Sequence, residues 1–193
     1  MKNSLFVIPV LLFLVLIACN QNTTSPKLAD VSATGKEDLI KRGEYLVQII
    51  GCHDCHSPKK MGPNGPEVIP ELMLSGYAAT TPAPKADKNF YAAGFSAFAP
   101  DFTSAAGFWG ISFAGNLTPD ATGIGTWTEE QFKKAFTQGK FKGQDGGRML
   151  LPPMPWYNFT TMANDDVKAI FNYLKSIKPV KNVVPLPIAP EKI

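Results

Sequence analysis

The residues with the clearest chemical signature are two cysteines and a histidine within five positions, Cys52, Cys55 and His56. They form the pattern Cys-x-x-Cys-His, the attachment sequence for a c-type haem. Cysteines at this spacing can present both sulfurs along one edge of a porphyrin and form thioethers with its two vinyl groups. His56 then falls beneath the ring, where a neutral imidazole nitrogen can bind the iron. The pattern predicts one covalent haem c with His56 as an axial ligand.

A Cys-x-x-Cys pair can also act as a redox dithiol or supply half of a zinc site. A zinc site would need two further ligands, but the chain has only two histidines and three cysteines. Both histidines, His53 and His56, lie inside the motif, and the third cysteine is Cys19. Haem attachment is therefore favoured, and His53 is expected to be an exposed spacer between the cysteines.

The sixth iron ligand decides between electron transfer and catalysis, and a methionine is the leading candidate because both histidines lie in the motif. Met154 lies in the segment Leu151-Pro152-Pro153-Met154-Pro155-Trp156. Proline fixes φ, and Pro155 favours an extended Met154. A segment this stiff can hold the Met154 thioether towards the metal, so little conformational entropy is lost when the thioether binds. A thioether paired with imidazole raises the potential of the iron. Met149 is the second candidate, although its leucine neighbours are more typical of a core.

The N-terminus is typical of an export signal. Lys2 supplies a positive charge, and an apolar stretch from Leu5 to Ala18 is too short to span a bilayer. It ends in Leu-Ile-Ala-Cys, similar to a bacterial lipobox, which predicts a signal peptide over residues 1–18 and lipidation of Cys19. An ordinary secretory signal is the alternative. Residues 19–34 are expected to be a flexible polar tether, placing the protein on the periplasmic side of a membrane.

Charge and length limit the other function classes. The formal charge of +3 falls to +2 when residues 1–18, which include Lys2, are removed, and two haem propionates would cancel it. With no basic tract, nucleic acid is not an expected partner. Residues 35–193 are long enough for one domain with a single core.

The spacing of apolar residues predicts a mainly α-helical domain. A first helix is expected from a capping box at Thr34 and Glu37 to Gly51. A second is expected over residues 129–138, with a capping box at Thr128 and Gln131 and a stop at Gly139. A third begins at Asn164-Asp165-Asp166 as cap and ends before Pro179.

A long insert, residues 57–115, follows the motif and lacks clear periodicity. Such a segment is uncommon in a compact domain. We expect it to be irregular and to wrap the haem edge through aromatic side chains, namely Phe90, Tyr91, Phe95, Phe98 and Phe102. A partly mobile surface loop or a lobe that docks a partner is an equally weighted alternative.

With the motif at 52–56, the proline-flanked Met154 and a helix at each end, the chain resembles class I cytochrome c. Two segments are similar to cytochrome c subunits of bacterial membrane dehydrogenases: Asn116-Leu117-Thr118-Pro119-Asp120 with the residues up to Trp127-Thr128, and Pro153-Met154-Pro155-Trp156. The match covers most of residues 36–193 and is weak through 60–110. It departs from the family in one respect, because related subunits often carry several haems and this chain carries a single motif.

The resemblance implies a pair of terminal helices that cross near Gly43 and Tyr173. It also suggests that haem propionates contact Asn116, Thr118, Trp127 and Arg148. For residues 116–120 the alternative is ordinary turn chemistry.

The expected function is electron transfer by a lipid-anchored monohaem cytochrome that exchanges electrons with a redox partner such as a dehydrogenase or an oxidase, without catalytic residues of its own. A haem enzyme or sensor with an open sixth site, such as a peroxidase or a small-molecule oxidase, is the alternative. An enzyme of this kind would also need acid–base groups beside the open site. Rapid binding of carbon monoxide to the reduced protein would distinguish an enzyme or a sensor from an electron carrier.

Overall fold

The structure is a computed structural model that describes residues 35–85 and 87–193. The predicted signal peptide, the lipidation site at Cys19 and the tether lie outside the described residues. So does Thr34, the first half of the predicted capping box. Within the described ranges, no helix has both the length and the apolar character needed to cross a bilayer.

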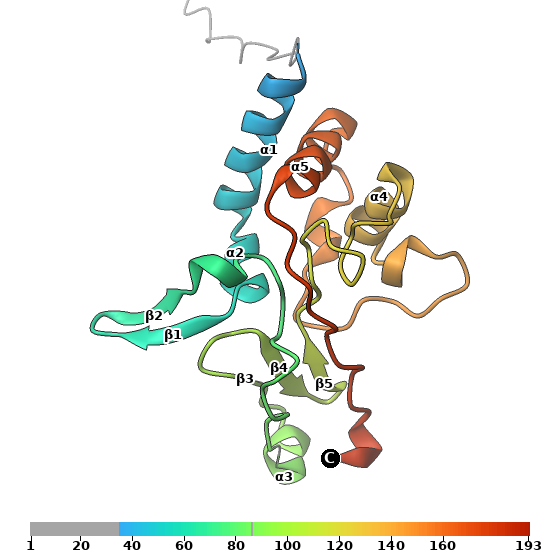
Figure 1. Cartoon of the computed structure of the whole chain (residues 1–193). Helices are drawn as coiled ribbons and strands as arrows, with labels where there is room; N and C mark the ends of the chain where they lie inside the picture. Colours follow the sequence, from blue (N-terminus) through green and yellow to red (C-terminus); the bar gives the residue numbers. More distant parts are fainter. Residues whose placement is uncertain (1–34, 86) are drawn as a thin grey trace, which may run out of the picture. The chain divides into compact units, whose positions relative to one another are not determined.

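Helices account for more of the described chain than strands, which confirms the mainly helical prediction. The longer helices are α1 (Lys36–Ile50), α4 (Glu129–Gln138) and α5 (Asn164–Ser176), which lie together at one end of Figure 1. Shorter helices are α2 (Cys52–His56) and α3 (Lys88–Ala92), with 3-10 turns at Pro70–Leu72, Phe141–Gly143, Trp156–Phe159 and Pro190–Lys192.

The predicted helix ends are confirmed in some places and corrected in others. The capping box of α4 is present: the Gln131 N–H donates to Thr128 Oγ1 at 3.1 Å, and the Thr128 N–H donates to Gln131 Oε1 at 2.9 Å. In α1 the N-cap is Gly35, so no side chain caps this end. In α5 the cap is Ala163, whose carbonyl accepts the first N–H groups, and Asn164 is already helical.

Gly43 brings α1 and α5 into close contact, as the resemblance implies. A Cβ atom added at Gly43 would overlap the carbonyl oxygen of Ala169 and lie 2.8 Å from Cβ of Tyr173. Next to Gly43, the Arg42 guanidinium donates to both carboxylate oxygens of Asp166, at 2.9 and 3.2 Å. Only glycine allows the backbones to approach this closely, so the predicted crossing near Gly43 and Tyr173 is confirmed.

A Gly43→Ala variant is therefore expected to destabilise the fold. Overpacking costs roughly 1–3 kcal/mol, and the overlap with a backbone carbonyl places this variant near the upper end. Alanine recovers about 1 kcal/mol of helix propensity, which leaves a net loss of up to about 2 kcal/mol. Urea unfolding followed by circular dichroism measures this loss. Glu44→Ala is the control, because Glu44 is exposed on the same helix and should change stability little. Equal stabilities of the two variants would contradict the close crossing.

The hydrophobic core lies between α1, α4 and α5. Its buried members include Val47 of α1, Phe132 and Phe136 of α4, and Ile170 and Leu174 of α5. Side chains from the haem motif and from the methionine segment pack against the same cluster, among them Cys52 and Met154. The core therefore connects the two segments that were predicted to supply haem ligands.

The insert is irregular only in part, and the strands within it correct the prediction for residues 57–115. Strands β1 (Lys59–Gly62) and β2 (Gly65–Val68) form an antiparallel hairpin. Strands β3 (Ala97–Phe98), β4 (Ser104–Gly107) and β5 (Gly110–Phe113) form an antiparallel sheet in sequence order. These strands are too short to show alternation, and their Gly, Ala and Pro residues are poor strand formers. Tight turns and pairing stabilise them instead.

The aromatic side chains of the insert lie mostly at the surface. Phe90 stacks on Phe95 with ring centroids 5.0 Å apart, and Phe98 contacts Phe102 at 5.9 Å. These four rings are between 41% and 58% exposed, and Tyr91 lies half-buried beside Phe90. Packing of these rings around a haem edge stays a prediction, as does the alternative of a docking lobe.

The chain after α5 runs back along the insert towards α3 (Figure 1). Ile188 pairs with Ile111 of β5 through two backbone hydrogen bonds of 2.8 and 2.9 Å. Closer to α5, the side-chain amide of Asn182 donates to the backbone carbonyls of Ser75 and Tyr77 at 2.7 and 2.8 Å. The C-terminal segment thus fixes the insert against the helical part of the chain.

Candidate functional site

The haem motif forms the helix α2, directly after α1. Gly51 ends α1 in the left-handed conformation, with φ 78° and ψ 32°, and α2 begins at the next residue. On a helix, positions i, i+3 and i+4 share one face. Cys52, Cys55 and His56 therefore lie on the same face of α2, the arrangement that a ligand bound by all three requires.

His56 is oriented by a backbone carbonyl from the end of the insert. Its Nδ1 lies 2.7 Å from the carbonyl oxygen of Gly115. A carbonyl only accepts, so Nδ1 carries the proton and Nε2 of the neutral ring keeps its lone pair. Burial lowers the pKa of His56, which also favours the neutral ring, against a smaller opposing effect of the bond to Gly115. This is the usual arrangement of a metal-binding histidine.

Gly115 is held in place by a close approach of two backbone segments. A Cβ at Gly76, whose φ is 77°, would lie 2.6 Å from the carbonyl carbon of Gly115. The Gly76 N–H donates to the His56 carbonyl at 2.8 Å, and the Tyr77 N–H donates to the Ala114 carbonyl at 2.9 Å. The segment around Gly76 thus joins the haem motif to the residue that orients its histidine.

The two cysteines have the properties of thiols rather than of thiolates. Burial raises the pKa of Cys52 to about 11 and raises that of Cys55 as well. A redox dithiol works in the opposite direction, with a lowered thiol pKa. Within the described part of the chain, no group of three or more His, Cys, Asp or Glu side chains could hold a metal ion. Two protonated thiols beside a neutral imidazole fit covalent haem attachment.

His53 differs from its prediction as an exposed spacer. It is half-buried, and its Nδ1 lies 3.3 Å from the hydroxyl of Ser57. The Ser57 hydroxyl also accepts a hydrogen bond of 2.9 Å from the Leu74 N–H, and Ser57 is fully buried. His53 is therefore engaged within the protein, on the turn that follows the motif.

Two hydrogen bonds fix the segment that leads into Met154. The Leu150 N–H donates to the Gly139 carbonyl at 2.7 Å, and the Ser112 hydroxyl of β5 donates to the Pro152 carbonyl. Met154 itself is half-buried and packs against the core cluster that also contacts Cys52. The structure thus brings the predicted ligand segment and the haem motif to one core.

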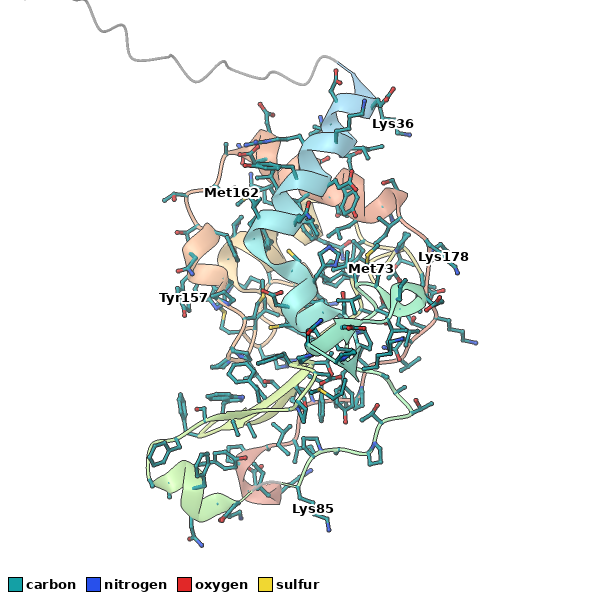
Figure 2. All side chains as sticks on the ribbon, turned by 90° about the vertical axis from the view of Figure 1, so that its left-hand side faces the viewer. Lys36, Met73, Lys85, Tyr157, Met162 and Lys178 are labelled. Atoms are coloured by element: carbon teal, nitrogen blue, oxygen red, sulfur yellow. The ribbon has the colours of Figure 1, made fainter. Side chains whose placement is uncertain are left out.

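The other methionines are placed differently. Met149 is 39% exposed, and Met61 is 71% exposed on β1. Met73 and Met162 are partly buried against the core, and in the view of Figure 2 they lie to either side of α1. Met149, the second candidate for the sixth ligand, does not pack against the core cluster as Met154 does.

The predicted propionate contacts fall into two groups, the first of which is engaged within the chain. Asn116 and Thr118 are 6% and 0% exposed. The Asn116 amide donates to the Val180 carbonyl at 2.8 Å and accepts from the N–H and hydroxyl of Thr118 at 2.9 and 2.8 Å. These bonds join the 116–125 turn to the C-terminal segment, and a propionate contact stays a prediction for both residues.

Arg148 and Trp127 form the second group. The Arg148 guanidinium lies over the Phe141 ring, 3.7 Å from its centroid, and donates to the Met149 carbonyl at 2.9 Å. Partial burial lowers its pKa. Trp127 is half-buried at the edge of the core, immediately before α4. A propionate contact stays a prediction for both residues.

Sequence reasoning missed three residues that organise this site: Gly115, Lys59 and Asn182. Gly115 acts through its backbone carbonyl, which leaves no sequence pattern. Lys59 bonds to backbone carbonyls near the motif, and Asn182 joins segments more than a hundred positions apart. The only sequence feature that could have pointed to any of the three is the position of Lys59, three residues after His56.

Relatives of known function match most of the chain. It is 26% identical over 182 residues to the fructose dehydrogenase cytochrome subunit of Gluconobacter japonicus, covering 91% of this chain and 30% of the relative. It is 29% identical over 155 residues to the gluconate 2-dehydrogenase cytochrome c subunit of Pantoea cypripedii, covering 79% and 26%. For the cytochrome c subunit of the quinone alcohol dehydrogenase of Gluconobacter oxydans (strain 621H), identity is 30% over 146 residues, covering 75% and 23%.

The chain spans less than a third of the length of each of these relatives. No protein-family model matches it. The matched regions nevertheless cover three quarters or more of this chain, and they confirm the resemblance drawn from the motifs. The chain is homologous, over most of its length, to the cytochrome c subunits of bacterial dehydrogenases.

Proposed function

We propose that this protein transfers electrons through one haem c bound covalently to Cys52 and Cys55. The observation that carries the proposal is the orientation of His56, whose Nδ1 donates to the Gly115 carbonyl at 2.7 Å and leaves Nε2 free for iron. The homologous cytochrome c subunits support electron transfer as the function, and the mainly helical structure supports a class I cytochrome c-like domain over residues 35–193.

We propose Met154 as the sixth ligand. Its segment is fixed by Ser112 and Gly139 and packs on the same core as Cys52, so the thioether needs little additional ordering to bind a metal. His56 and Met154 together would keep the iron six-coordinate in both oxidation states. Little rearrangement would then accompany each electron transfer.

The chain's own residues provide binding, orientation and exclusion of water. The thiols of α2 bind, the Gly115 carbonyl orients His56, and the core formed by α1, α4 and α5 keeps the site dry. We assign Arg148 to a haem propionate, because it is an exposed cation held over the Phe141 ring. We keep Trp127 as a neighbouring contact. The bound haem supplies the one-electron chemistry.

The proposed partner is a dehydrogenase that donates electrons to the haem, as the names of the relatives suggest. The alternative partner is an oxidase that accepts electrons from it. The proposed location is the periplasmic side of a bacterial membrane, with a lipid on Cys19 as anchor. Several acyl chains are needed for firm anchoring, since one chain gives an association constant of only about 10⁴ M⁻¹.

Binding of carbon monoxide to the reduced, haem-loaded protein tests this function. A six-coordinate carrier should show no change in its spectrum on mixing, because the Met154 thioether would already be bound to the iron. An open site, as in a haem enzyme or sensor, would bind carbon monoxide at once. Rapid and complete binding by the wild-type protein would therefore contradict the proposed electron carrier.

A further inference from the structure

Lys59 lies at the start of β1, and its ammonium group contacts the haem motif from the side of the insert. Its Nζ donates to the backbone carbonyls of His53, Asp54 and Ser57 at 3.3, 2.7 and 3.0 Å. It also donates to the carbonyl of Asp101, between β3 and β4, at 2.9 Å. An ammonium has three hydrogens, so at least one is shared between two of these four acceptors.

The first two acceptors belong to the last turn of α2. The His53 carbonyl also accepts the Ser57 N–H at 3.3 Å, whereas Pro58, four positions after Asp54, has no N–H to donate to the Asp54 carbonyl. A cation near the carbonyls at the end of a helix interacts favourably with them. In the described chain α2 has five residues, too few to form a stable helix without outside contacts. Lys59 supplies such a contact on the turn that carries Cys55 and His56, and so acts as its C-terminal cap.

The fourth acceptor connects this turn to the insert. The Asp101 carboxylate is engaged elsewhere, because it accepts from the N–H and hydroxyl of Thr103 at 3.1 and 2.8 Å. Lys59 therefore meets the Asp101 carbonyl. The ring of Phe102, a non-glycine residue with φ 62°, lies 5.9 Å from Lys59 Nζ. The insert thus covers the ammonium with an aromatic ring.

All four acceptors of Lys59 are neutral carbonyls, and this determines the electrostatic effect. A carboxylate partner would cancel the positive charge, whereas carbonyls leave it in place. Asp54 and Asp101 are the nearest acids and offset the charge in part, but Asp54 is exposed to solvent. A cation in partly buried surroundings is screened less than a surface charge. It therefore acts on an iron bound at His56.

We propose that Lys59 is a positioning residue that caps the attachment helix and ties it to the insert, and that its only partly offset charge raises the reduction potential of the haem. This inference rests on the proposed function, since it assumes haem at the motif. Ferric haem carries one more positive charge than ferrous haem. A fixed cation nearby therefore disfavours the oxidised form.

The test compares the haem-loaded wild type with Lys59→Met, Lys59→Arg and Lys60→Met. Lys60 is the matched control, because it is exposed and adjacent. Lys59→Met is expected to lower the equilibrium constant for reduction about tenfold, which is about 59 mV in a spectroelectrochemical titration. Lys59→Arg and Lys60→Met should stay near the wild-type potential. The difference should persist in molar salt, unlike that of a surface charge.

Hydrogen exchange provides the second readout. Amides of residues 53–57 should exchange faster in Lys59→Met than in Lys60→Met. The proposal would be overturned if Lys59→Met changed neither the reduction potential nor the rate of hydrogen exchange. It would also be overturned if Lys59→Arg lost as much potential, or as much attached haem, as Lys59→Met. Loss of attached haem in Lys59→Met alone would support the capping role. Absence of haem from the wild type would instead refute the proposed function, which keeps the two failures distinct.

Discussion

Replacing Cys52 and Cys55 together by alanine is expected to abolish covalent haem. Each thioether forms by adding a thiol across a vinyl double bond: the sulfur bonds to one carbon and the hydrogen goes to the other. Burial raises the pKa values of both cysteines and so keeps them in the thiol form that this addition uses. When both sulfurs are absent, no thioether can form, and haem staining of a denaturing gel should fall to background.

The control for this variant lies inside the motif. His53→Ala should retain covalent haem and the wild-type spectrum, because His53 contacts Ser57 and not the face that carries the cysteines and His56. Single replacement of either cysteine leaves one thioether and should retain haem at lower yield. Haem that survives denaturation in the double variant would show attachment at another site and would contradict the assignment.

Met154→Ala has the second largest expected effect. Loss of the thioether should convert the iron from six-coordinate low-spin to an open or water-bound form. The equilibrium constant for reduction should fall more than hundredfold, or about 120 mV for a one-electron couple. The reduced variant should also bind carbon monoxide rapidly, which the wild type should not. Absorption spectroscopy and a potentiometric titration measure both changes.

Three other methionines serve as controls for this variant. Met149→Ala removes the second candidate, which is 39% exposed, and Met73→Ala and Met162→Ala remove residues that pack on the core as Met154 does. All three should keep the low-spin spectrum, although the two core variants should lose some stability. A low-spin spectrum and potential that survive in Met154→Ala but are lost in one of these three would reassign the ligand.

Local sequence patterns predicted the helices well. The Thr128–Gln131 capping box and the left-handed Gly51 and Gly139 are determined by residues within a few positions of one another, and they are present in the structure. The crossing of α1 and α5 at Gly43 was predicted from the resemblance, which implies a close contact between helices where the sequence shows a glycine in the middle of a helix. Where the prediction was wrong, as at Asn164, the helix start was displaced by a single residue.

The remaining parts of the site depend on contacts between distant segments. His56 meets Gly115 across 59 positions, and Asn182 meets Ser75 across 107. Both acceptors are backbone carbonyls, so no side-chain pattern marks them. The strands of the insert were missed because they are short and rich in Gly and Ala, and only their pairing reveals them. Lys59 carried no signal beyond its position after the motif.

The intact mass of the denatured protein, purified from cells that attach haem, tests the central claim most directly. The expected mass is that of the mature polypeptide with its lipid plus one haem, because one pair of cysteines in the described chain stands beside an oriented histidine. Denaturation removes any haem that is held by ligation alone. The mass of the lipidated polypeptide without haem would contradict covalent haem attachment at Cys52 and Cys55.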